Sequence, residues 1–111
     1  LELPIDSCVA RELRADAPTR TIPREAIAAD EAMFDVGPQT VARFAAIIRR
    51  AKTVLWNGPM GVFETPPFDA GTNGVAHALV AATQGGATTI VGGGEVAAAI
   101  SKAGLEADVT H

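Results

Sequence analysis

The 111-residue sequence predicts an α/β fold in which a parallel sheet carries helices on both faces, a Rossmann-like three-layer arrangement. In its second half, short apolar runs alternate with segments of helical periodicity, which is the pattern of strands joined by crossover helices. Two of these apolar runs end in glycine-rich turns, and ligands of parallel α/β sheets bind at such strand ends. A chain of this length encloses one core, so residues 1–111 are predicted to form part of a single domain.

The first predicted strand covers residues 3–9, where apolar side chains recur at alternating positions. Residues 11–36 carry many charges and turn residues without a sustained period, so we expect a long excursion with one short strand near 20–22 and little contribution to the core. Because the chain opens directly into a strand and closes where another strand starts, at 109–111, we expect a domain truncated at both ends, part of a longer polypeptide.

The first helix is predicted to begin at Gly37-Pro38, because proline is favoured at the first helical position. Its apolar face comprises Val41, Phe44, Ala45 and Ile48. Residues 53–56 follow at once and combine β-branched and aromatic side chains, so they are predicted to form a buried strand.

The second helix is predicted over residues 69–83, and its inward face comprises Val75, Ala78, Leu79 and Ala82. His77 falls nearly opposite that face and has no metal-ligating neighbour at helical spacing, so we expect a solvated side chain. A strand at 88–91 and an alanine-rich helix at 95–103, which closes at Gly104, complete the pattern.

Composition excludes several classes of partner. The net charge of -4 is spread along the chain without a basic stripe, so we expect no nucleic-acid partner. No apolar run approaches the roughly 20 residues that cross a bilayer, so we expect no membrane association and a cytoplasmic location. Cys8 is the single cysteine and is expected to be a small buried hydrophobe.

The first candidate site follows the strand at 53–56 and reads Trp56-Asn57-Gly58-Pro59-Met60-Gly61-Val62-Phe63-Glu64. Gly58 and Gly61 allow the backbone to approach a ligand closely, Pro59 stiffens the turn between them, and Glu64 adds a carboxylate downstream. The alternative is a tight strand-to-loop turn with an exposed acid, since these dipeptides are common in turns.

The second candidate site is the triplet Gly92-Gly93-Gly94 between the last strand and the last helix. Its amides and the helix start suit phosphate oxygens, and Gly92, Gly94 and Ala97 also satisfy a loose dinucleotide pattern. Glu95 would repel a bare pyrophosphate unless a cation such as Mg²⁺ lay between them. Alternatively, Glu95 complements the helix dipole and the glycines ease packing.

Together these segments resemble the carboxyl-terminal, nucleotide-binding part of the phosphoglycerate kinase family. The strings that carry the resemblance are Leu3-Pro4-Ile5-Asp6, Asp35-Val36-Gly37-Pro38, the run from Trp56 to Glu64, and Gly92-Gly93-Gly94-Glu95. They occur in the family's order with similar spacing across nearly the whole chain.

The resemblance implies phosphoryl transfer between 1,3-bisphosphoglycerate and ADP, with Mg²⁺ as cofactor. The nucleotide-binding positions it implies are Asn57, Gly58, Pro59, Glu64, Gly93, Gly94, Glu95 and Val96. Among these, Glu64 is expected to accept hydrogen bonds from the ribose hydroxyls, and Glu95 to ligate the metal. The family usually has aspartate at the place of Glu95 and threonine or serine at the place of Val96, so this chain has a longer metal ligand and lacks one hydroxyl.

The resemblance also implies partners: ADP or ATP, and the remainder of a monomeric parent chain that includes the phosphoglycerate-binding domain. Phosphoryl transfer depends on positioning and charge stabilisation, so we expect the fragment alone to be inactive. A noncatalytic or dinucleotide-binding α/β module that keeps these loops for packing or for another ligand remains the alternative.

Overall fold

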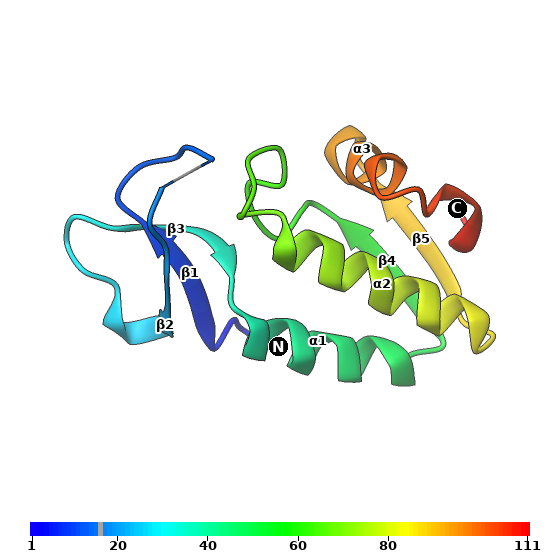
Figure 1. The fold of residues 1–111 in the computed structure, drawn as a ribbon. Coiled ribbons are helices and arrows are strands. Elements are labelled where there is room, and N and C mark those ends of the chain that lie inside the picture. The colour runs from blue at the N-terminus through cyan, green and yellow to red at the C-terminus, as the bar shows by residue number, and fades with distance from the viewer. Residues whose placement is uncertain (16) are drawn as a thin grey trace.

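The computed structural model describes residues 1–15 and 17–111, which form two sheets and three helices longer than one turn (Figure 1). The strands are β1 (Asp6–Ala10), β2 (Arg20–Pro23), β3 (Ala32–Val36), β4 (Thr53–Asn57) and β5 (Thr88–Gly92). The helices are α1 (Pro38–Arg50), α2 (Ala70–Gln84) and α3 (Gly94–Lys102), with short 3-10 turns at Arg24–Ala26 and Glu106–Asp108. An antiparallel sheet in the order β2-β1-β3 occupies one end of the molecule and the parallel pair β4-β5 the other.

The parallel pair and its helices confirm the predicted α/β class. β4 and β5 pair in register, and Trp56 of β4 is buried against Val75 and Leu79 of α2 and Val96 and Ile100 of α3. The predicted inward face of α2 is buried throughout. α1 and α2 lie side by side (Figure 1), and α1 joins β3 of the antiparallel sheet to β4 of the parallel pair.

The strand expected at 109–111 is not formed, but the last residue of the chain is hydrogen-bonded to β5. The His111 amide donates to the Thr89 carbonyl at 3.0 Å, and the Val91 amide donates to the His111 carbonyl at 2.8 Å. These two bonds join the last residue to β5, on alternate residues of the strand, as in a β-ladder.

α1 begins at Pro38 with Gly37 as its N-cap, as predicted, but the side chain that caps it comes from β1. The Asp6 carboxylate accepts the amides of Gln39 at 3.0 Å and Thr40 at 2.8 Å. These bonds satisfy two of the amides that a helix start leaves without partners. β1 and α1 are therefore joined through one buried acid.

The predicted strand at 3–9 begins later than expected, at Asp6. Leu3 and Ile5 are exposed, so the first two of the alternating apolar positions do not face a core, whereas Val9 is buried. Pro4 has no amide to donate to a sheet, and the Ile5 amide donates to the Thr40 hydroxyl at 3.0 Å. Contacts with α1 replace strand pairing in this segment.

The prediction that residues 11–36 contribute little core is wrong. The expected strand is present as β2, but β3 was missed, and both strands pair antiparallel with β1. Ile22 and Val36 are buried, and the Phe34 ring lies 5.1 Å from the Phe68 ring, centroid to centroid. This segment forms a second core at the antiparallel end of the molecule.

The prediction that the strand at 53–56 is buried holds for Trp56, which is 5% exposed, but not for Leu55, which is 68% exposed. His77 is exposed, as predicted.

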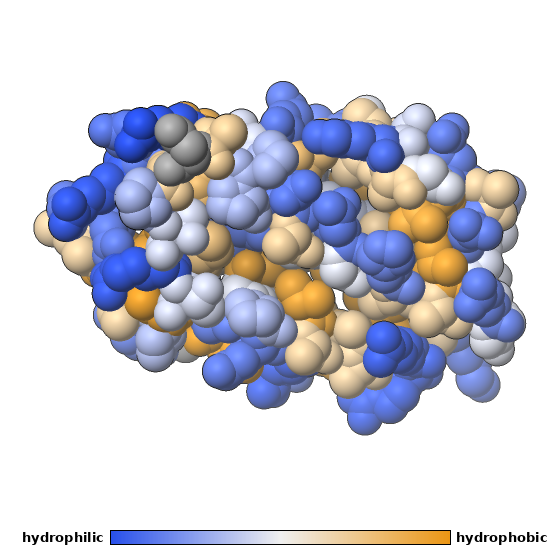
Figure 2. Space-filling model, viewed as in Figure 1, coloured by the Kyte–Doolittle hydropathy of each residue, from blue (hydrophilic) through white to orange (hydrophobic). Residues whose placement is uncertain are grey.

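The face seen in Figure 1 is mostly hydrophilic with scattered apolar patches (Figure 2). None of the helices in the described part of the chain combines the length and the apolar character that a bilayer crossing needs.

Candidate functional site

The two glycine-rich loops leave the parallel sheet side by side. β4 and β5 run in the same direction, and their last residues, Asn57 and Gly92, are register partners. The Asn57 side chain lies against the glycine triplet, because a Cβ atom on Gly93 would be 3.1 Å from the Asn57 Oδ1. The structure thus brings together two stretches of chain that are 35 residues apart, as the parallel sheet predicts.

The glycine triplet opens α3 in a conformation that presents free amides. Gly93 is the N-cap, with φ +86 and ψ 145, a region that is essentially restricted to glycine. No side chain caps the helix, so the amides of its first turn remain available to a ligand. Gly93, Gly94 and Glu95 are exposed, whereas the Val96 side chain is fully buried and offers a ligand only its backbone.

The loop after β4 is open at its start and anchored in its middle. Asn57 is exposed, Gly58 has a φ of +114, and Pro59 is partly exposed. The Met60 amide donates to the Thr72 hydroxyl at 3.1 Å. Loop residues 57–59 are therefore accessible beside the glycine triplet while the next residue is held by α2.

The Glu64 carboxylate is exposed at the far end of this loop. No hydrogen bond within the described part of the chain joins it to the glycine triplet. Of the predicted positions, the structure therefore gathers Asn57 and the triplet directly, and it leaves Glu64 on an accessible but separate part of the loop.

A protein-only metal cage is absent from the described residues, where no three His, Cys, Asp or Glu side chains gather to hold an ion. Glu95 is the one acid in the first turn of α3. A single exposed carboxylate is the donor set with which proteins hold Mg²⁺ when substrate phosphates supply other ligands. The site fits a metal that arrives with a nucleotide.

Asp35 is a buried acid whose role sequence reasoning missed. Its side chain is 1% exposed and accepts the amides of Gly71 at 2.8 Å and Val36 at 2.9 Å. Burial raises the pKa of the carboxyl to about 6, against the opposing effect of the two amide bonds. The local signal was a lone acid between Phe34 and Val36, and this signal does not reveal its distant partner.

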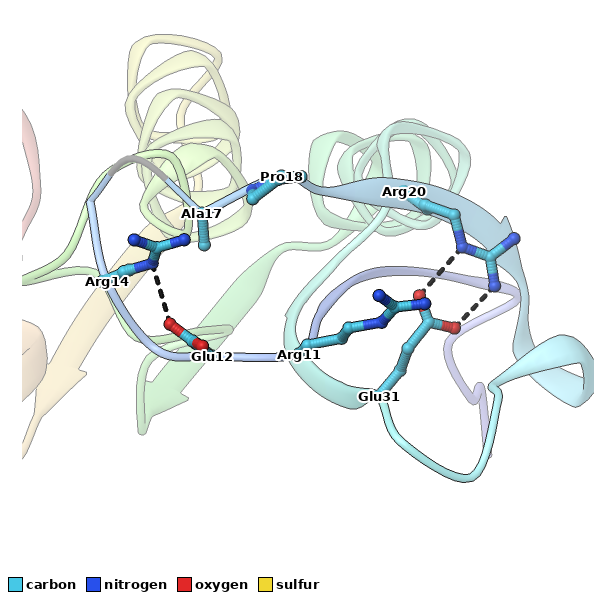
Figure 3. A pocket seen from close by; sticks show the side chains of 7 residues that line it. All are labelled: Arg11, Glu12, Arg14, Ala17, Pro18, Arg20 and Glu31. Atoms are coloured by element: carbon cyan, nitrogen blue, oxygen red, sulfur yellow. Dashed lines mark hydrogen bonds and ion pairs between the residues drawn. The ribbon is translucent and has the colours of Figure 1, made fainter.

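A cavity of about 420 Å³ lies elsewhere, beside β2. Its lining comprises Arg11, Glu12, Arg14, Ala17, Pro18, Arg20 and Glu31 (Figure 3). Three guanidinium groups in such a cavity suggest an anion site, so their partners decide its character.

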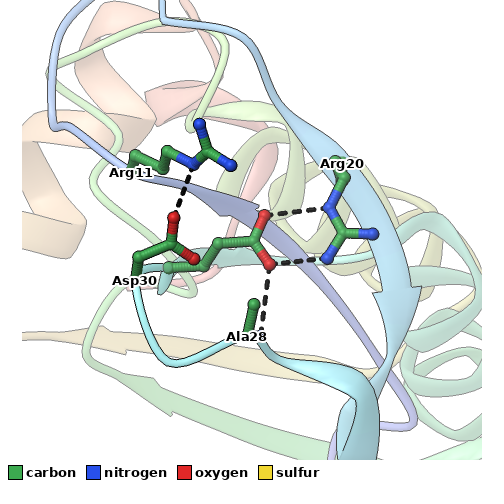
Figure 4. A network of polar contacts seen from close by, with 5 residues as sticks. Arg11, Arg20, Ala28 and Asp30 are labelled. Carbon is green, nitrogen blue, oxygen red and sulfur yellow. Dashed lines mark hydrogen bonds and ion pairs between the residues drawn. The ribbon is translucent and has the colours of Figure 1, made fainter.

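Each of these guanidinium groups already faces a carboxylate. Arg20 contacts Glu31 at 2.6 Å, and its hydrogen bonds lower the pKa of the Glu31 carboxyl to about 2. Arg11 contacts Asp30 at 2.8 Å (Figure 4). Arg14 contacts Glu12 at 2.9 Å. Three cations balanced by three anions create no excess positive charge, so these described residues make a structural network rather than a phosphate site.

Comparisons of the sequence with known proteins identify one family. The family model described as phosphoglycerate kinase matches residues 1–111. A phosphoglycerate kinase of Chlorobaculum tepidum is 56% identical over 111 residues, which cover 100% of this chain and 28% of the relative. One of Mycobacterium ulcerans is 49% identical over 112 residues, covering 100% of this chain and 27% of the relative.

Solved structures show the same relation. The phosphoglycerate kinase of Coxiella burnetii superposes with a TM-score of 0.94 at 42% identity, over 99% of this chain and 28% of that one. The enzyme of Pyrococcus horikoshii gives a TM-score of 0.77 at 27% identity, over 99% and 26%. The sequence thus spans little more than a quarter of the proteins it matches. By its sequence and its fold, the chain belongs to the phosphoglycerate kinase family.

Proposed function

We propose that this chain supplies part of the magnesium-nucleotide site of a kinase that transfers a phosphoryl group between 1,3-bisphosphoglycerate and ADP, giving 3-phosphoglycerate and ATP. The observation that carries the proposal is the contact between Asn57 and the glycine triplet at the paired ends of β4 and β5. Both loops are accessible there, at the edge where parallel α/β sheets bind nucleotides.

The roles of the residues follow from their chemistry. The uncapped amides at Gly94 and Glu95, together with the positive end of the α3 dipole, attract phosphate oxygens. Asn57, Gly58 and Pro59 line the nucleotide pocket, and Glu64 accepts hydrogen bonds from the ribose. Mg²⁺, when bound with the nucleotide, neutralises the charge that develops on the transferring group.

Glu95 would hold that ion. Its exposed position in the first turn of α3 places a carboxylate next to the amides that attract the phosphates. Without an ion between them, the carboxylate and the phosphates would repel each other.

The binding of the other substrate is proposed to depend on groups outside this chain. In the described residues, Arg11, Arg20 and Arg43 are held in ion pairs with carboxylates. We propose that the residues that bind phosphoglycerate lie in the remainder of a longer, monomeric and cytoplasmic polypeptide. A dinucleotide-binding module is the second candidate, because Gly92, Gly94 and Ala97 satisfy the looser dinucleotide pattern after β5.

Substitution of Glu95 separates the two candidates in the complete polypeptide. If the carboxylate holds a metal, Glu95→Gln weakens ADP binding in the presence of Mg²⁺ and slightly strengthens it with chelator. If the loop binds a metal-free pyrophosphate, Glu95→Gln strengthens NAD binding under both conditions, because it removes a repulsive charge. Calorimetric titration of ADP and NAD into both proteins measures this.

Two variants control the comparison. Glu95→Asp restores the acid usual in the family and is expected to bind Mg-ADP at least as tightly as the parent. Asp108→Asn removes one exposed negative charge outside both loops and is expected to leave binding unchanged. Tighter Mg-ADP binding by Glu95→Gln would overturn the metal-ligand role.

A further inference from the structure

Asp35 lies where three elements meet: β3, the loop after β4, and the first turn of α2. Its Oδ2 accepts the Gly71 amide of α2 at 2.8 Å, and its Oδ1 accepts the Val36 amide of β3 at 2.9 Å. The side chain is 1% exposed, so both bonds form away from water. A buried carboxylate held in this way fixes the direction from which α2 starts.

Two glycines are pressed against this carboxyl group. A Cβ atom on Gly61 would lie 2.5 Å from the Asp35 Oδ1 and 2.6 Å from the Phe34 carbonyl oxygen. A Cβ atom on Gly71 would overlap the same Oδ1. The backbone of the loop and the backbone of α2 therefore contact Asp35 directly, at distances that only glycine permits.

Two further hydrogen bonds, one to β3 and one to α2, hold the loop in this position. The Val62 amide donates to the Phe34 carbonyl at 2.9 Å, which ties the loop to β3. The Met60 amide donates to the hydroxyl of Thr72, a fully buried residue that follows Gly71 in α2. The segment from Met60 to Val62 is thus held between β3 and α2.

We propose that Asp35 is a positioning residue for the nucleotide. It fixes the segment from Met60 to Val62 between β3 and α2, and this segment in turn holds Asn57, Gly58 and Pro59 beside the glycine triplet. This role rests on the proposed nucleotide site, and it is exerted through the loop, because the Asp35 side chain is 1% exposed and is not accessible to a ligand.

The geometry of the position calls for two acceptor oxygens on one side chain. Two amides point at two oxygens, and asparagine would offer one oxygen and one NH2 group, which would face an amide donor. One of the two bonds is then lost, and the first turn of α2 or the end of β3 moves. Asp69 and Cys8, the register partner of Asp35 on β1, are the titratable neighbours that interact with it.

The test uses Asp35→Asn in the complete polypeptide, with Asp6→Asn as the matched control. Asp6 is also a buried acid that accepts two amides at a helix start, but it serves α1 rather than the loop. Asp35→Asn is expected to raise the dissociation constant of Mg-ADP by about tenfold, with the KM for 3-phosphoglycerate unchanged. Asp6→Asn is expected to lower stability in urea while leaving the dissociation constant of Mg-ADP unchanged.

A second pair of variants keeps the test decisive if Asp35→Asn does not fold. Gly61→Ala pushes the loop off Asp35, whereas Gly74→Ala places a Cβ atom equally close, 2.5 Å, to the Val41 Cγ1 on α1. We expect the first to weaken Mg-ADP binding and the second only to lower stability.

The outcomes distinguish this inference from the proposed function. Suppose that the parent protein binds Mg-ADP and that Asp35→Asn and Gly61→Ala lose stability without losing affinity for Mg-ADP. Asp35 is then merely structural and the inference fails. If the parent protein itself does not bind Mg-ADP, the proposed function fails, and the inference fails with it.

Discussion

Asp6 and Asp35 accept similar hydrogen bonds, but their pKa values shift in opposite directions. Both are buried, and both accept two backbone amides near the start of a helix. Burial alone would raise the pKa of Asp6, but the Thr40 hydroxyl and two amides outweigh it and lower the pKa. Asp35 has no hydroxyl donor, so burial dominates and raises its pKa to about 6, with a further contribution from Asp69.

These shifts predict opposite effects of pH on stability. The Asp35 carboxyl has a pKa of about 6 in the folded chain against an ordinary 3.8, so its neutral form favours folding. Its contribution is complete below the ordinary value and is lost as pH rises through the folded pKa. Urea unfolding of the parent and of Asp35→Asn between these two values is expected to show a pH-dependent difference, and a constant difference would contradict this.

Asp6 gives the opposite expectation within the same experiment. Its lowered pKa makes the ionised form favour folding, so its contribution is present above 3.8 and is lost as pH falls through the folded value. Asp6→Asn should therefore destabilise the protein at neutral pH and converge with the parent in acid.

In the glycine triplet, Gly93 combines a backbone conformation that favours glycine with close packing against Asn57. Gly93→Ala would place a side chain at φ +86 and bring its Cβ atom to 3.1 Å from the Asn57 Oδ1. We expect a loss of about 1–3 kcal/mol in stability together with weaker Mg-ADP binding, because Asn57 must move.

Gly86→Ala is the control for strain alone. Gly86 has a φ of +101, and no atom lies within 4 Å of its Cβ position. Its replacement is expected to lower stability and to leave nucleotide affinity unchanged. Equal affinities for both glycine variants would contradict the packing of Asn57 against the triplet.

The elements differ in how far local sequence determines them. The start of α1 was predicted from Pro38, and α3 was predicted to within one residue at each end, because Gly104 marks where it stops. β3 was not predicted, because Ala32-Met33-Phe34-Asp35-Val36 has no regular alternation and depends on pairing with β1. The two loops were identified from their glycines, whereas the role of Asp35 depends on Gly71, 36 residues away.

In the molecule as a whole, the helices leave one face of the parallel pair β4-β5 incompletely covered. An apolar groove of about 230 Å³ runs along β4 between the helices, with Phe44, Val54 and Trp56 among its lining. Leu55 is 68% exposed, and β4 pairs with β5 alone in the described part of the chain. Exposed strand edges of this kind promote association with other strands.

The isolated chain is therefore expected to be marginally folded and without phosphoglycerate kinase activity. The groups proposed to bind phosphoglycerate lie outside it, and its apolar groove remains open to water. A coupled assay on purified protein, with thermal unfolding and light scattering, measures these properties. Turnover above background would refute the expected inactivity, and a sharp cooperative melt of a dilute monomer would refute the expected marginal folding.

The two hydrogen bonds between Asp6 and the start of α1 also link the protection of that helix start to the presence of β1. The Asp6 carboxylate and the amides it accepts are 33 and 34 residues apart, so the cap forms only after a long loop has closed. Until then, α1 keeps two unsatisfied amides at its first turn. We therefore expect the amide protons of Gln39 and Thr40 to resist exchange with solvent only while β1 is in place and to become exchangeable together when it leaves.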